Sequence, residues 1–133
     1  MQVTGAESNN QRKRILLVED DTFLAGMYVS KLKLADFEVK LADNGEDGLN
    51  LAKKELPNLI LLDILLPRMD GFEVIKRLKK DPMTAKIPII LLTNLGQKKD
   101  VDQGMALGAK DYLIKAHFMP SEVIAKIKKI LKS

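Results

Sequence analysis

Five short apolar runs of strand length alternate with stretches whose apolar residues recur every three or four positions, and no other feature limits the fold of this chain as much. The runs expected to form strands cover residues 15–18, 37–41, 59–62, 87–92 and 112–114. Runs 15–18, 59–62 and 87–92 are almost continuously apolar, which is typical of strands buried on both faces. Strands that alternate with helices predict a doubly wound α/β fold with a parallel sheet.

The helices are expected between these strands and after the last one. They cover roughly 24–35, 45–56, 71–80, 97–107 and a final stretch that buries Val123, Ile127, Ile130 and Leu131. Run 37–41 alternates apolar and charged residues, and run 112–114 is short, so both suit the edges of a sheet. The flavodoxin-like (βα)5 order 2-1-3-4-5 places the second and fifth strands at the edges, and we expect that order.

Size and composition indicate one globular domain at residues 12–133, after a polar, flexible arm at 1–11. The chain has 133 residues, a net charge of +4 and no cysteine, which excludes disulfides and thiolate metal sites. Its lysines recur at helical spacing without aromatic residues among them, so we expect solvated helix faces and no specific nucleic-acid binding. A polar N-terminus and short apolar runs predict neither a signal peptide nor a membrane span, so we expect a cytoplasmic protein.

Carboxylates follow two strands that should be neighbours in this order. Glu19, Asp20 and Asp21 come directly after the first strand, and Asp63 follows the third. Open parallel sheets bind their ligands at the carboxyl ends of the strands, where the strand order reverses. Crowded like charges destabilise one another unless a cation lies among them, and Mg2+ prefers oxygen ligands. We therefore expect a Mg2+ site here, with acidic loop residues that bind nothing as the alternative.

Two further strand ends carry a hydroxyl and an ammonium group. Thr93 follows the fourth strand and Lys115 follows the fifth. Together with a cation, such groups stabilise the phosphoryl oxygens of an acyl phosphate formed on a carboxylate. Polar groups at four strand ends indicate phosphoryl chemistry more strongly than any one of them does alone.

Four motifs give the chain a specific resemblance to a known family. They are ILLVEDD at 15–21, LLDILLPRMDG at 61–71, LLTN at 91–94 and GAKDYLIK at 108–115. With them the chain resembles the receiver domain of response regulators in two-component systems, from about residue 14 to 131. The resemblance implies a phosphoacceptor rather than an enzyme. Asp63 would take its phosphoryl group from a sensor histidine kinase or a histidine phosphotransfer protein.

The same resemblance implies a site for Mg2+, or for Mn2+ in its place. Glu19 and Asp20 would organise the ion, with Asp20, Asp63 and the backbone carbonyl of Leu65 as ligands. Leu65 and Leu95 are apolar at the two positions from which a side chain could hold an attacking water. We therefore expect slow loss of the phosphoryl group from the aspartate.

Thr93, Lys115 and Tyr112 would form the switch. The resemblance implies that Thr93 and Lys115 bind phosphoryl oxygens and that Tyr112 turns inward when Thr93 moves. The change would reach a surface made of helix 97–107, the fifth strand and the last helix. That surface would bind a downstream protein or a second copy of the chain.

Helix 97–107 should shift at low cost, because its apolar anchors are few, chiefly Val101 and Met105. The segment from Gly104 to Gly108 resembles a phosphate loop but has the wrong spacing. We expect it to be the end of this helix, with Gly108 as its C-terminal cap.

The chain departs from the family pattern in two places. Asn94 stands where the family has a smaller residue, and Lys115-Ala116 replaces a Lys-Pro pair. We expect a trans bond before Ala116, because a cis bond to a non-proline residue costs about 2.5–4 kcal/mol. His117 lengthens the loop, and as the only histidine it excludes a His-based metal site or catalytic triad.

Two other functions share these features. A phosphohydrolase with Asp63 as nucleophile needs a carboxylate two residues further on as general acid and base, and the residue there is Leu65. A receiver-like adaptor that is never phosphorylated remains an open alternative, although the set of site residues disfavours it.

Overall fold

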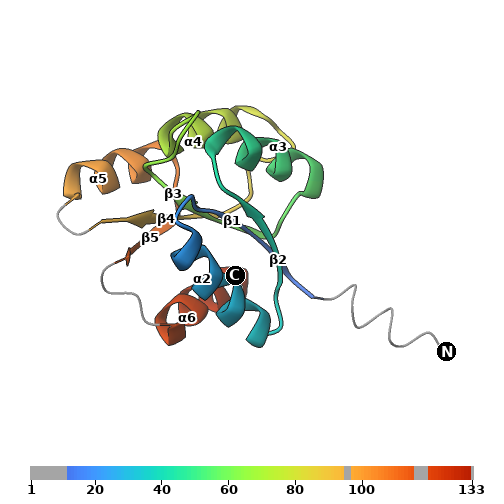
Figure 1. Ribbon diagram of the computed structural model, residues 1–133. Helices are drawn as coiled ribbons and strands as arrows, with labels where there is room; N and C mark the ends of the chain where they lie inside the picture. The colour runs from blue at the N-terminus through green and yellow to red at the C-terminus, as the bar shows by residue number, and fades with distance from the viewer. Residues whose placement is uncertain (1–11, 95–96, 116–119, 133) are drawn as a thin grey trace.

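Figure 1 shows the computed structural model of the chain, which describes residues 12–94, 97–115 and 120–132. Its strands are β1 (Arg14–Val18), β2 (Glu38–Ala42), β3 (Leu59–Asp63), β4 (Ile89–Thr93) and β5 (Asp111–Ile114). Its helices are α2 (Thr22–Leu34), α3 (Gly45–Glu55), α4 (Gly71–Lys80), α5 (Lys98–Leu107) and α6 (Pro120–Lys132). The strands are parallel and lie in the order β2-β1-β3-β4-β5, which confirms the predicted flavodoxin-like sheet.

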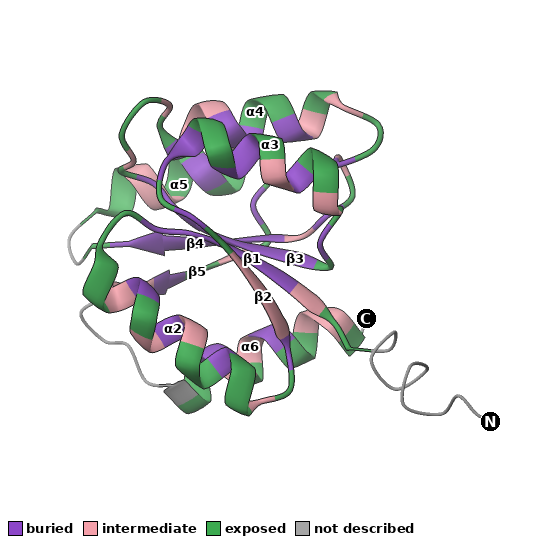
Figure 2. Cartoon of the chain, turned by 45° about the vertical axis from the view of Figure 1, so that its right-hand side comes forward, coloured by how far each residue is buried: buried purple, intermediate pink, exposed green. Residues whose placement is uncertain are grey.

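Helices cover both faces of the sheet, with α3, α4 and α5 on one side and α2 and α6 on the other (Figures 1 and 2). Because successive strand residues point to opposite faces, Leu16 and Val18 pack beneath α3 and α4, whereas Ile15 and Leu17 pack against α2 and α6. All residues of β3 and β4 are buried, as their continuous apolar runs predict. The edge strands β2 and β5 are more exposed.

Strand β4 begins two residues later than its apolar run. Pro88 has no N–H to give to the sheet, although its carbonyl accepts a hydrogen bond from Ile60 N at 3.0 Å. Pairing therefore starts at Ile89 and continues to Thr93. This register brings Thr93 to the carboxyl edge of the sheet.

Short polar caps start the helices that follow the first three strands. Asp21, Asn44 and Asp70 each accept a hydrogen bond from the backbone N–H three residues further on, at 3.0, 2.8 and 3.0 Å respectively. Such caps satisfy backbone donors that have no partner inside the helix. They allow α2, α3 and α4 to begin close to the carboxyl edge of the sheet.

Helix α5 packs differently from the prediction. Met105 is 37% exposed and Val101 is only half-buried, so neither anchors the helix. The only buried residue of α5 is Gly104, where an added methyl group would lie 2.3 Å from Leu91 Cδ1. Helix α5 therefore contacts the sheet through the close approach of its backbone at Gly104, and not through a stripe of apolar side chains. Gly108 ends the helix with φ +122°, so the two glycines belong to a helix and its cap, as predicted.

The burial predicted for the last helix is confirmed in part. Val123 and Ile127 of α6 are buried, whereas Ile130 and Leu131 are half-buried at its C-terminal end. Among the residues that the structure describes, no helix has the length and apolar character needed to cross a membrane.

Candidate functional site

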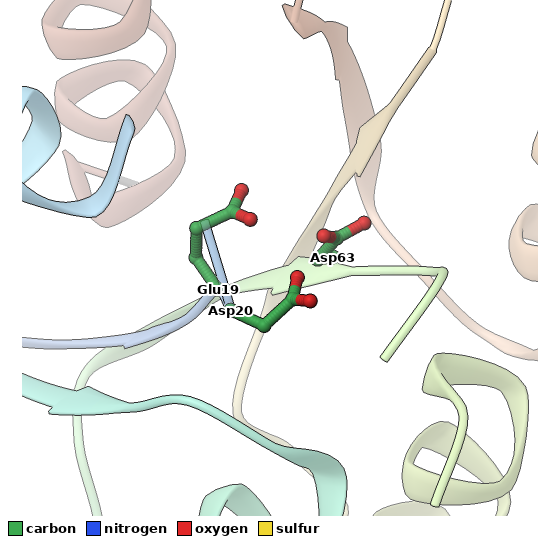
Figure 3. A group of neighbouring side chains, drawn as sticks. All are labelled: Glu19, Asp20 and Asp63. Carbon is green, nitrogen blue, oxygen red and sulfur yellow. The ribbon is translucent and has the colours of Figure 1, made fainter. Parts of the chain in front are cut away.

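The carboxyl ends of β1 and β3 bring three carboxylates together. Val18 and Leu62 are partners in the sheet, so the residues that follow them, Glu19 and Asp63, emerge side by side. One carboxylate oxygen from each of Glu19, Asp20 and Asp63 lies within 4.8 Å of the others (Figure 3). Strand pairing is thus what gathers the three acidic side chains.

The three carboxylates differ in depth. Glu19 is 1% exposed and Asp63 is 3% exposed, whereas Asp20 lies at the surface. They line an open hollow whose other lining residues are Asp21, Leu24, Leu65, Asn94 and Lys115. The cluster therefore has a solvent-facing side at Asp20 and a buried side at Glu19 and Asp63.

Lys115 reaches the buried side of the cluster from the end of β5. Its Nζ lies 2.7 Å from Asp63 Oδ2 and 3.1 Å from Glu19 Oε1. Burial alone lowers the pKa of Lys115, but the hydrogen bond to Asp63 and the charges of Asp63 and Glu19 outweigh burial and raise that pKa. Lys115 is therefore a charged counter-ion to both buried carboxylates.

Glu19 has an environment that suits a metal ion. Burial raises the pKa of Glu19 to about 7, opposed by the hydrogen bond from Asp21 N and supported by the charge of Asp63. Within the described part of the chain, its buried Oε1 accepts no hydrogen bond, and its contact with Lys115 is an ion pair only. A buried oxygen of this kind beside two further carboxylates fits a divalent cation with oxygen ligands, such as Mg2+.

Asp63 is held at both carboxylate oxygens. Oδ1 accepts the N–H of Leu65 at 3.2 Å, and Oδ2 accepts a hydrogen bond from Lys115 at 2.7 Å. The Leu65 side chain is 58% exposed and apolar, so position 65 offers no general acid or base beside Asp63. This geometry disfavours the phosphohydrolase alternative.

Thr93 and Tyr112 line a neighbouring groove between α5 and β5 and not the acidic hollow. Its other lining residues are Asn94, Gln97, Lys98, Val101, Asp102, Met105 and Ile114. Thr93 is buried, and its hydroxyl donates to the carbonyl of Asn94 at 3.4 Å. Asn94 lines both the hollow and the groove. The sequence marked Asn94 only as a departure from the family pattern, since its place between two cavities depends on the folded sheet.

Tyr112 is 39% exposed and contacts α6. Lys126 Nζ lies 5.9 Å from the centroid of the Tyr112 ring and 2.9 Å from Asp111 Oδ2. A cation over an aromatic face is worth about 0.5–1 kcal/mol at an exposed site. Lys126 thus favours the outward position of the ring. In the sequence, Lys126 is one of several lysines on a solvated helix face and carries no such signal.

Several sequence predictions concern residues outside the described ranges. These are the arm at 1–11, the apolar residue Leu95, and the trans bond and longer loop at Ala116 and His117. They stay predictions. Lys115, which precedes that loop, is described and points into the acidic cluster.

Comparison with known proteins places most of the chain in one family model. The model described as response regulator receiver domain matches residues 15–128. The DNA-binding dual master transcriptional regulator RpaA of Synechocystis sp. is 41% identical over 119 residues, and the probable transcriptional regulator ycf27 of Porphyra purpurea is 37% identical over 123 residues. These matches cover 90% and 92% of the chain but 49% of each relative. The chain therefore spans about half the length of these curated relatives.

Solved structures with the same fold include two that match nearly the whole chain. A putative response regulator from Chloroflexus aurantiacus has a TM-score of 0.88 and 36% identity, covering 92% of this chain and 100% of that one. The receiver domain of the sensor histidine kinase PA1611 from Pseudomonas aeruginosa has a TM-score of 0.85 and 26% identity, covering 92% of this chain and 99% of that one. The PA1611 structure has a magnesium ion coordinated in its active site cleft.

Proposed function

The chain belongs to the response regulator receiver domain family, the signalling phosphoacceptors of two-component systems, and we propose Asp63 as its phosphoacceptor. The donor is the phosphohistidine of a sensor histidine kinase or of a histidine phosphotransfer protein. One observation carries the proposal. Asp63 is a buried carboxylate that contacts Lys115 at 2.7 Å and shares a cluster with Glu19 and Asp20.

In the proposed transfer, an oxygen of Asp63 attacks the phosphorus atom, and an O–P bond forms. The N–P bond to the donor histidine breaks, and its electron pair stays on the imidazole nitrogen. The hydrogen bonds from Leu65 N at 3.2 Å and Lys115 Nζ at 2.7 Å fix the plane of the carboxylate before the attack. Such fixed geometry lowers the entropic part of the barrier.

We propose Mg2+ as the cofactor of this site, with Mn2+ as a substitute. Asp20, Asp63 and the backbone carbonyl of Leu65 would hold the ion, with Glu19 behind them. When bound, the ion neutralises charge on the phosphoryl oxygens and on the carboxylates. Lys115 Nζ contacts Asp63 Oδ2 at 2.7 Å, which supports its proposed role in binding a phosphoryl oxygen.

The output proposed for the phosphorylated state is a change in the surface of α5, β5 and α6. The hydroxyl of Thr93 leaves its long hydrogen bond to the Asn94 carbonyl for a phosphoryl oxygen, and Tyr112 turns inward. The surface then binds a downstream protein or a second copy of the chain, and nucleic acid only weakly. Slow loss of the phosphoryl group follows from the apolar side chain of Leu65, which holds no water.

Mass spectrometry of the intact protein tests the phosphoacceptor. The wild type and Asp63→Asn are treated with a small phosphodonor such as acetyl phosphate, with Mg2+ or with EDTA. We expect one added phosphoryl group on the wild type with Mg2+ only, and none on Asp63→Asn. Asp36→Asn is the matched control, since it removes a carboxylate after the end of α2, where φ is +70° and Asn is tolerated. Equal labelling of wild type and Asp63→Asn would contradict the assignment.

A further inference from the structure

The loop between β3 and α4 contains Leu65, whose backbone carbonyl is one of the proposed metal ligands. This loop has an unusual local structure. Gly71 N donates to the carbonyl of Ile64 at 2.8 Å and closes the base of the loop. At its tip, Met69 N donates to the carbonyl of Pro67 at 2.8 Å, with Arg68 between them at φ +69°. This is a γ-turn of the strained kind, which persists only where the surroundings hold it.

The first turn of α3 contacts this tip. Gly45 N donates to the carbonyl of Pro67 at 3.3 Å, and the Glu46 carboxylate forms an ion pair with the Arg68 guanidinium. A methyl group on Gly45 would lie 1.7 Å from the Met69 carbonyl oxygen and 2.9 Å from Met69 Cβ. Backbone therefore packs directly on backbone here, and only glycine leaves room for it.

We propose that Gly45 and Glu46 are positioning residues for the metal site, because they hold the loop that presents the Leu65 carbonyl. This inference rests on the proposed Mg2+ site. Mg2+ requires near-octahedral ligands at about 2.0–2.1 Å. A side chain at position 45 pushes the loop outward by more than about 1 Å, given the contact distances of carbon atoms. The carbonyl then leaves the ion, although position 45 is never itself a ligand.

The test compares Gly45→Ala with Gly104→Ala by isothermal titration of Mg2+ into each protein. At Gly104 an added methyl meets Leu91 Cδ1 at 2.3 Å, so this control also crowds a helix against the molecule, but against the sheet and not against the tip of the loop. We expect Gly45→Ala to bind Mg2+ about 10-fold to 100-fold more weakly than wild type, as for residues that orient metal ligands. Gly104→Ala should bind Mg2+ as wild type does.

A second pair of variants keeps the test open if Gly45→Ala does not fold. Glu46→Gln removes the ion pair with Arg68, whereas Glu73→Gln removes the exposed pair with Arg77, which has a similar exposure but lies on α4. We expect weaker Mg2+ binding, by about 2-fold to 5-fold, for Glu46→Gln only, in keeping with the small free energy of exposed ion pairs.

Amide NMR shifts in EDTA give a readout that needs no metal. Gly45→Ala and Glu46→Gln should shift the amides of Leu65, Leu66, Arg68 and Met69, and neither control should. Unchanged Mg2+ affinity in Gly45→Ala, or an equal loss in Gly104→Ala, would overturn the inference. If Gly45→Ala does not fold, equal Mg2+ affinities of Glu46→Gln and Glu73→Gln would overturn it as well. A wild type that binds no Mg2+ would instead overturn the proposed metal site, while the EDTA spectra would still report whether α3 holds the loop.

Discussion

Helices α4 and α5 each have ten residues, and each follows a strand that ends in a site residue, Asp63 on β3 and Thr93 on β4. Helix α4 buries Gly71, Val74, Ile75 and Leu78, whereas α5 buries Gly104 alone. The two helices therefore differ greatly in the apolar area that opposes their movement. Buried apolar side chains thus fasten the helix that follows Asp63 to the sheet, and we expect the helix that follows Thr93 to shift more easily.

Truncating one side chain in each helix should expose this difference most strongly. We expect Leu78→Ala in α4 to lower the free energy of unfolding by about 2–5 kcal/mol, as for fully buried leucines. Met105→Ala in α5 should cost about 0.5 kcal/mol, because Met105 is 37% exposed. Urea unfolding of both variants measures this. Similar losses would mean that α5 is anchored as firmly as α4.

A phosphoryl mimic should have the next largest effect, and it should affect α5 and α4 differently. With Mg2+ and beryllofluoride, we expect amide hydrogen exchange in α5 and β5 to change by about 5-fold or more, which corresponds to a coupling of about 1 kcal/mol. Exchange in α4 should stay constant. The matching control is Asp63→Asn, which should show no response. Changes confined to the residues of the acidic hollow would remove α5 from the proposed output.

Adding a methyl group beneath α5 should have a smaller effect. In Gly104→Ala, crowding against Leu91 costs about 1–3 kcal/mol, and the gain in helix propensity returns about 1 kcal/mol. We expect a net loss of about 1 kcal/mol. Gly26→Ala on α2 is the control, since its methyl meets nothing within 4 Å and should stabilise the protein. If Gly104→Ala raised the free energy of unfolding instead, α5 would be able to move away from Leu91 without loss of stability.

The smallest effect should come from the contact that holds Tyr112 outward. We expect Lys126→Met to change the free energy of unfolding by less than about 1 kcal/mol, because both of its interactions are partly exposed. It should nevertheless make the beryllofluoride response of α5 and β5 occur at a lower mimic concentration. Lys128→Met, at an exposed position of the same helix, is the control. If wild type and Lys126→Met gave identical beryllofluoride titrations, Lys126 would have no role in the proposed switch.

Local patterns predicted the sheet and the meeting of Glu19 and Asp63, because strand order and register follow from apolar runs and connection rules. They did not predict that Gly104 is the buried residue of α5. An isolated glycine in a helical pattern looks like a weak point, and its packing depends on Leu91, which lies beneath it in the sheet. Val101 and Met105 were the apolar residues at helical spacing, and they proved to lie at the surface or half-buried.

Contacts between distant segments account for the other features that the sequence did not predict. Gly45 could be recognised only as part of a helix start, since its close approach to Met69 joins the start of α3 to the loop between β3 and α4. The contact of the Tyr112 ring on β5 with Lys126 likewise joins a strand to a separate helix, α6. Such side-chain positions are set by tertiary packing, which periodicity does not record.

The contacts of Lys115 also bear on when the chain becomes competent to receive a signal. Lys115 is 96 positions from Glu19 and 52 positions from Asp63 along the chain. Contacts at such separations form only after long loops have closed, and β5 is the last of the five strands of this sheet to be synthesised. A chain whose β5 has not yet joined the sheet leaves its acidic cluster without the ammonium group. In nascent and partly folded copies the proposed transfer to Asp63 would therefore proceed without the Lys115 ammonium group, and we expect it to be slower there.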